Sequence, residues 1–195
     1  MRHRRRGRKL GRNPNHQRAL LRNLASALLL TERDADDDDN APKVRGRIVT
    51  TLEKAKEVRP LVERCVTIAR RSLGAQQEAD GLATTAERNS AEWREWRNGD
   101  GWRRWNAAIA PTIAARRRAL RLLGDKQAVR ILFAEIAPRF ADRHGGYTRI
   151  MRLAKPRLGD AGTRAILEFV GIRDRVSERS AAPSFDAPAE PAAAE

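Results

Sequence analysis

The sequence predicts a two-layer α/β (α+β) fold, in which a small three-stranded sheet packs on helices and a basic extended arm precedes the folded part. Three features of the chain support this fold class. Apolar residues recur at helical spacing in several segments between residues 14 and 138. Residues 147–153 and 165–170 change to a period of two, which is typical of half-buried strands. The short β-branched run at residues 47–50 supplies the third strand.

The first twelve residues predict an arm that binds a polyanion. They contain no carboxylate, and their cationic side chains are Arg2, Arg4, Arg5, Arg6, Arg8, Lys9 and Arg12. Like charges this close repel one another and cannot share a core. Guanidinium groups pair bidentately with phosphate oxygens, so nucleic acid is the expected partner. The alternative is a targeting segment or a solvated charge run.

A helix is expected directly after the arm, with Asn13 as its cap and Pro14 at its first position. Its apolar face consists of Leu20, Leu21, Leu24 and Leu28. That face should pack on the rest of the fold. The other face carries Arg18 and Arg22 and continues the basic surface of the arm.

Residues 31–46 predict a solvated loop. Their charge reverses sharply to acidic from Glu32 to Asp39, and they offer no apolar face. A loop for a divalent cation is the alternative, because carboxylates are hard ligands. The EF-hand spacing, with its central Gly and terminal Glu, is absent.

A second long helix is expected after the first strand. Thr50 and Glu53 predict a capping box at its start, and Gly74 predicts its end. Cys65 lies in its apolar stripe, where a small buried side chain is favoured over a nucleophile.

Residues 74–111 contain all four tryptophans of the chain, in two pairs spaced three apart. Asn98 to Gly101 predicts a turn between two short helical pieces. The indoles either pack on one another or on the edge of the domain, or they stack with bases or a partner protein. In the second case Arg94, Arg97, Arg103 and Arg104 would contribute their guanidinium planes.

Two helices should follow as a hairpin, one from Pro111 to Leu123 and one from its cap Asp125 to Pro138. Two strands joined by a basic loop come next, at residues 147–153 and 165–170. These strands and residues 47–50 form the sheet. The Ala/Pro-rich residues 174–195 predict a disordered tail.

The composition predicts binding to a polyanion. The chain has 195 residues and a formal net charge of +15, from 40 Lys and Arg against 25 Asp and Glu. The length fits one domain with appendages. The single cysteine excludes an internal disulfide framework and most cysteine-built zinc sites, which suits the cytoplasm. We expect no membrane partner, because no apolar run is long enough for a span or a signal peptide.

Catalysis is not expected from this sequence. Its histidines are His3, His16 and His144, and none has a carboxylate or nucleophile at motif spacing. We therefore expect no enzyme, no cofactor, no metal and no small-molecule substrate. A basic DNA-binding architectural protein is an alternative function, although no helix-turn-helix signature is present.

Three segments carry a family resemblance: MRHRRRGRKLGRNPNHQRALLRNLASALL, TTLEKAKEVRPLVERCVTIARR and LFAEIAPRFADRHGGYTRIMRLAKPRLGDAGTRAILEFV. Over residues 1–30, 47–73 and 112–173 the chain resembles the family of the seventeenth protein of the bacterial large ribosomal subunit. The MRHR opening, joined to a HGGYTRI hairpin and a loop containing GD, makes the resemblance specific. The segments at 31–46 and 74–111 resemble insertions into the family pattern.

The resemblance implies a structural constituent of the large subunit, which binds large-subunit rRNA and lies near the exit of the nascent-chain tunnel. It implies a mixed three-stranded sheet, neighbouring ribosomal proteins as partners, and a cytoplasmic, ribosome-associated location. The organisation would be an arm at 1–12, one domain at 13–173 and the tail. The expected RNA-binding residues are Arg2, His3, Arg4, Arg5, Arg6, Arg8, Lys9, Arg12, Arg18, Arg22, Lys54, Lys56, Arg149, Arg152, Lys155 and Arg157.

Overall fold

The computed structural model describes residues 7–8, 10–35 and 39–171. The predicted tail and most of the arm lie outside the described residues. The secondary structure runs, in order, as α1 (Pro14–Leu30), β1 (Arg47–Thr51), α2 (Leu52–Arg71), α3 (Leu73–Leu82), α4 (Ala91–Asn98), α5 (Asp100–Leu123), α6 (Lys126–Ile131), the π-helical turn η1 (Leu132–Ile136), α7 (Ala137–Arg139), β2 (Thr148–Arg152) and β3 (Arg164–Phe169).

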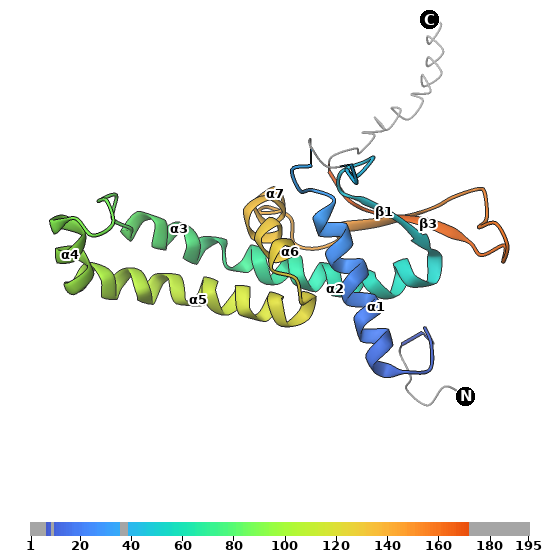
Figure 1. The fold of residues 1–195 in the computed structure, drawn as a ribbon, viewed down its shortest axis with the longest axis horizontal. Coiled ribbons are helices and arrows are strands. Elements are labelled where there is room, and N and C mark those ends of the chain that lie inside the picture. The colour runs from blue at the N-terminus through green and yellow to red at the C-terminus, as the bar shows by residue number, and fades with distance from the viewer. Residues whose placement is uncertain (1–6, 9, 36–38, 172–195) are drawn as a thin grey trace, which may run out of the picture.

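The molecule has a two-layer body and a long helical projection (Figure 1). In the body, α2 packs on one face of the sheet, and α1 and the segment from α6 to α7 pack beside α2. The projection consists of α3 and the first half of α5, side by side, with α4 at its far end. The predicted α+β fold class is confirmed.

The sheet has the order β1-β3-β2, and both pairings are antiparallel. The expectation of a mixed sheet is therefore wrong. The loop after β2 reverses the chain into β3, so these two strands are antiparallel. On the other edge of β3 lies β1, which also runs antiparallel to β3. Ile48, Leu167 and Ile150 lie in register across the three strands on the face toward α2.

The core lies between this face of the sheet and the helices. Its largest fully buried side chains include Tyr147, Leu28, Leu29, Leu132, Ile136, Leu167, Val58, Val62 and Val66. The opposite face of the sheet carries Val49, which is 51% exposed. The two faces of the sheet differ because side chains alternate along each strand. On β3, Ala165, Leu167 and Phe169 are buried toward the helices.

Two predicted helix starts are confirmed. The Asn13 side chain accepts a hydrogen bond of 2.8 Å from the Asn15 N–H, and Pro14 is the first helical residue. The Asp125 carboxylate accepts a hydrogen bond of 3.0 Å from the Ala128 N–H. Gly124, between α5 and α6, adopts the left-handed conformation that ends α5, at φ +78°.

The predicted boundaries of the second long helix are wrong at both ends. Thr50 lies in β1, paired with Ala165, so no capping box forms and α2 begins at Leu52. Gly74 lies inside α3. The break between α2 and α3 falls at Ser72 instead. Its hydroxyl donates a hydrogen bond of 2.7 Å to the Ala69 carbonyl oxygen.

The tryptophan segment and the helix after it also differ from the prediction. The turn between the two tryptophan pairs is present, at Gly99 between α4 and α5. The helix expected to start at Pro111 starts at Asp100, and Pro111 lies within it. A proline removes only one backbone hydrogen bond, and this one is exposed, so the helix continues past it.

The acidic segment is only partly solvated. Glu32 is buried and accepts a hydrogen bond from Arg139. The Thr31 hydroxyl oxygen accepts a hydrogen bond of 2.9 Å from the Gly46 N–H, which joins the two ends of the segment. The expectation of a solvated loop is therefore wrong for Glu32, because a partner distant in sequence compensates the burial of its charge.

Candidate nucleic-acid interface

Two predicted residues of α1 border a basic hollow of about 410 Å³. Arg18 and Arg22 are one helical turn apart and exposed, and the hollow is closed by Leu123 and Gly124 at the end of α5. Nη2 of Arg22 donates a hydrogen bond of 3.0 Å to the Arg121 carbonyl oxygen. This bond fixes the basic face of α1 against the C-terminal end of α5.

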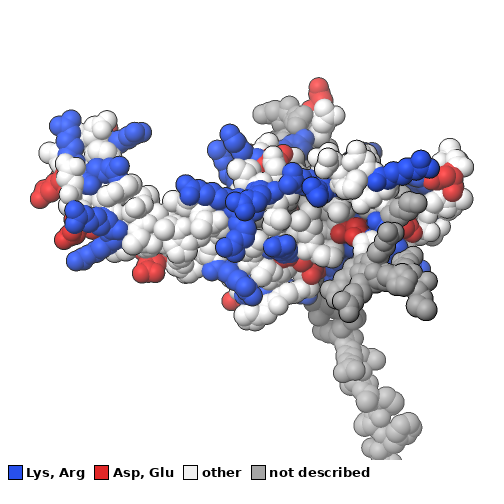
Figure 2. Space-filling view, turned by 90° about the horizontal axis from the view of Figure 1, so that it is seen from below, with Lys and Arg blue, Asp and Glu red and all other residues white. Residues whose placement is uncertain are grey.

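The C-terminal half of α5 extends this surface with arginines that the sequence prediction missed. Arg118 and Arg121 are exposed, and Arg118 borders a groove between α2 and α5 together with Arg71. We define the basic band as Arg18, Arg22, Arg71, Arg118 and Arg121. Figure 2 shows Lys and Arg gathered over this part of the molecule. The RRR run at 116–118, followed by Arg121, was the signal that could have identified it.

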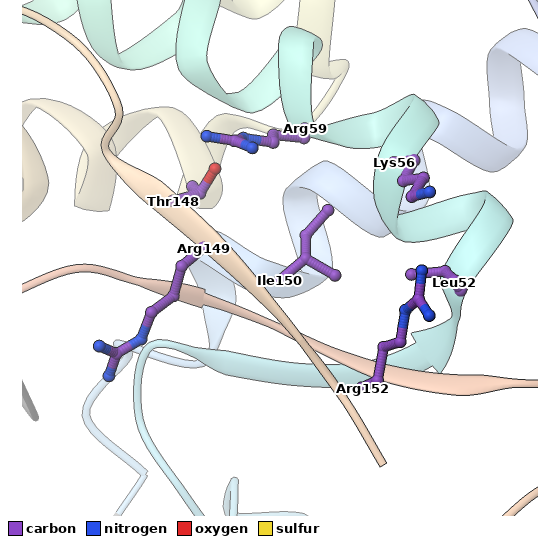
Figure 3. Close-up of a pocket in the computed structure, with 7 residues that line it drawn as sticks. All are labelled: Leu52, Lys56, Arg59, Thr148, Arg149, Ile150 and Arg152. Atoms are coloured by element: carbon purple, nitrogen blue, oxygen red, sulfur yellow. The ribbon is translucent and has the colours of Figure 1, made fainter. Parts of the chain in front are cut away.

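A second basic hollow, of about 520 Å³, lies between α2 and the edge strand β2 (Figure 3). The fold brings the predicted residues Lys56 and Arg152 together here, with Arg59 between α2 and β2 as a residue that the sequence prediction missed. Nε of Arg59 donates a hydrogen bond of 3.0 Å to Oε1 of Glu63, and the Thr148 hydroxyl donates a second hydrogen bond to the same oxygen. These bonds orient the Arg59 guanidinium along the hollow.

Two further predicted residues do not direct their charge into this hollow: Arg149 lines it but turns its guanidinium away, and Lys54 does not line it. Arg149 points away from Lys56 and Arg152 (Figure 3), and its guanidinium binds Glu168 on the opposite face of the sheet. Lys54 is half-buried on the other flank of α2, since two residues along a helix differ by about 200°. The fold therefore does not gather all predicted α2 and β2 cations on one surface.

The loop between β2 and β3 holds its cations in a defined shape. Nε of Arg157 donates a hydrogen bond of 2.8 Å to Oδ1 of Asp160, and Nη2 of Arg157 donates another to Oδ2. The hydrogen bonds from Arg157, and then the one from the Gly162 N–H, lower the pKa of Asp160 well below its ordinary value. The same pair raises the pKa of Arg157. Lys155 is exposed on this loop.

The described end of the arm lies beside α2. The Arg8 N–H donates 3.3 Å to Oε2 of Glu57, and Arg12 is exposed. The remaining predicted arm residues lie outside the described residues, namely Arg2, His3, Arg4, Arg5, Arg6 and Lys9. Arg8 therefore contacts α2 at Glu57, one residue after Lys56.

The arrangement suits electrostatic binding of phosphates. Guanidinium and ammonium groups line open hollows, where they can pair with phosphate oxygens.

Burial raises the pKa of the Cys65 thiol to about 12, so this thiol stays neutral. In the part of the chain that the structure describes, no cluster of His, Cys, Asp and Glu could hold a metal ion. The same part holds no helix with the length and hydropathy of a membrane span.

Comparisons with known proteins point to one family. The family model described as ribosomal protein L17 matches residues 20–170. The chain is 63% identical to the large ribosomal subunit protein bL17 of Rhodopirellula baltica, over 95% of this chain and 89% of that protein. It is 37% identical to the bL17 protein of Agrobacterium fabrum, over 100% and 99% of the two chains. With that of Nitratidesulfovibrio vulgaris it shares 36% identity, over 94% and 98%.

Proposed function

The chain belongs to the ribosomal protein L17 family, and from this membership we propose that it holds large-subunit rRNA through contacts to phosphate groups. Membership makes it a structural constituent of the large ribosomal subunit in the bacterial cytoplasm, and not an enzyme. We also propose neighbouring large-subunit proteins as partners and a position near the nascent-chain tunnel exit, as the family resemblance implies. The DNA-binding alternative gains no support from these relatives.

The observation that carries the RNA proposal is the basic band. Its arginines come from three helices that are distant in sequence, and the Arg22 to Arg121 bond fixes two of those helices together. A rigid array of guanidinium groups can match the phosphate positions of A-form RNA by shape, without reading bases. The hollow at Lys56, Arg59 and Arg152 offers a second contact of the same kind.

The arm would supplement these rigid surfaces. An extended segment can pass between RNA helices where a globular surface does not fit, and its ordering costs conformational entropy. If about eight phosphates are neutralised in total, the logarithm of the binding constant should fall with the logarithm of salt concentration with a slope on the order of −7.

The test is sedimentation of a cell lysate on sucrose gradients at low and at high salt, with the protein followed by mass spectrometry. We expect it to migrate with the large subunit through the high-salt wash. Migration with chromosomal DNA, or loss from the subunit at modest salt, would contradict the proposal.

A further inference from the structure

The helical projection ends in a small aromatic core of its own. We define the spike as residues 73–110, which comprise α3, α4 and the first half of α5. At its tip the rings of Trp96 and Trp102 meet edge to face at 5.8 Å, and those of Trp102 and Trp105 stack at 5.0 Å. Of the alternatives that the sequence leaves open, packing of the indoles on one another is found for these three.

The packing at the tip is tight. The guanidinium carbon of Arg97 lies 3.4 Å from the centre of the Trp102 ring. A Cβ built on Gly101 would come within 2.5 Å of the Trp96 ring, so only glycine fits there. A tip packed in this way is preorganised, which lowers the entropy that a contact through it would cost.

None of these indoles is fully buried. Trp93, one turn before Trp96 on α4, is half-buried, and no aromatic ring of the described residues contacts it. Its partly exposed indole therefore presents apolar surface at the end of the spike. Tryptophan and arginine are the residue types most enriched at the energetic centres of protein interfaces.

The charge of the spike differs from that of the rest of the chain. Residues 73–110 contain five arginines and six carboxylates, a net charge of −1, in a chain of net charge +15. Figure 2 shows cationic and anionic side chains intermixed at the tip, separated from the basic band by uncharged surface. Binding to RNA draws its affinity from neutralised phosphates, and a segment without excess positive charge supplies little of it.

We propose that the tip of the spike docks on a neighbouring protein of the large subunit, with Trp93 in an apolar depression of that protein and Arg103 and Arg104 paired with carboxylates around it. This inference rests on the proposed function, because it needs the body to be bound to the subunit. The partner presents a mixed-charge surface with an apolar centre, which complements the tip.

A charge variant separates a protein partner from RNA. The Arg103 side chain is 80% exposed in its ion pair with Asp100, and Arg104 is exposed, so Arg103→Ala with Arg104→Ala removes two surface cations and leaves the tryptophans in place. A protein partner predicts an unchanged salt slope for rRNA binding, whereas phosphate contacts at these arginines would make the slope less steep by about 1.4 to 1.8. A flattened slope would overturn the proposal.

The contact itself is tested by photo-crosslinking within intact large subunits. Trp93→p-benzoylphenylalanine places the probe at the tip, and Gln77→p-benzoylphenylalanine, exposed on α3, is the matched control. We expect the tip probe to crosslink to one ribosomal protein in higher yield than the control. Crosslinks to rRNA alone, or a yield no higher than the control, would overturn the docking inference while leaving subunit binding intact. Failure of the unsubstituted chain to sediment with the subunit would instead contradict the proposed function.

Discussion

The Glu32 carboxylate accepts a hydrogen bond of 2.8 Å from Nη1 of Arg139, although the two residues are 107 positions apart. The Glu32 side chain is 5% exposed and that of Arg139 is 27% exposed. The bond connects the start of the acidic segment to α7. The neighbouring pair of Asp34 and Arg45, at 3.9 Å, is exposed instead.

Replacing Glu32 should therefore destabilise the fold much more than replacing Asp34. We expect Glu32→Ala to lower the free energy of unfolding by about 2 kcal/mol, because it leaves the partly buried Arg139 without its partner. Asp34→Ala should change it by about 0.5 kcal/mol or less, as for exposed ion pairs in general. Urea denaturation of both variants measures the difference, and equal losses would contradict this account.

Glu168 connects all three strands on the open face of the sheet. Its side chain is 4% exposed, because it accepts hydrogen bonds from Arg47 on β1 and Arg149 on β2. Glu168→Gln should lower the free energy of unfolding by about 2 kcal/mol, since two charge-assisted bonds are weakened together. Asp100→Asn, in the exposed pair with Arg103, is the control, and an equal effect there would refute the role of Glu168.

Local signals in the sequence predicted local structure well. Asn13 and Asp125 cap helices through backbone N–H groups two and three residues away, so short patterns sufficed. Thr50 failed as a cap because Ala165 on β3 holds it in the sheet. The resemblance implies an RNA-binding role for Arg149, but its partner Glu168 follows only from the register of β2 on β3.

The basic band, too, could be predicted only in part from local sequence patterns. Arg18 and Arg22 were predicted from one helix, whereas Arg118 and Arg121 join them only through the packing of α1 on α5. Helical periodicity indicates which residues share a face, but it does not say which faces of different helices meet. The π-helical turn at Leu132–Ile136 also left no sign in the apolar spacing.

The loop after β2 should respond to pH only under strongly acidic conditions. The folded-state pKa of Asp160 is lowered by Arg157, so its contribution to stability is present above the ordinary aspartate pKa of about 3.9 and is lost as the pH falls toward the lower folded value. A titration of the Asp160 carboxyl by NMR measures this pKa. Arg157→Gln should return it toward its ordinary value, and an unchanged pKa would show that Arg157 is not the cause.

Cys65 should be inert in the folded protein. It is fully buried, and burial raises its pKa to about 12. Its neutral form stabilises the fold fully below the pKa of the unfolded thiol, about 8.5, and this contribution is lost as the pH rises toward 12. We expect no alkylation by iodoacetamide at about pH 8 without denaturant and complete alkylation in urea. Rapid alkylation of the native protein would contradict the buried position.

The basic band should contribute to RNA binding in proportion to its charge. Arg118→Ala with Arg121→Ala removes two exposed cations, while the hydrogen bond from Arg22 survives because it uses the Arg121 carbonyl. Alanine is also favourable in a helix, so the free energy of unfolding should not fall. Affinity for large-subunit rRNA should drop, and the salt slope should become less steep by about 1.4 to 1.8.

Removal of residues 2–12 provides the comparison for the band, because it deletes the cations of the arm and, among the described contacts, costs the body the exposed hydrogen bonds at Glu57 and Gln17. It should also weaken binding and flatten the salt slope, by about 0.9 for each phosphate that the arm neutralises. Both changes should act on all RNA segments alike, since binding to phosphates carries no sequence information. Binding measured at several salt concentrations tests both variants. An unchanged slope for either one would show that its cations do not reach phosphates in the complex.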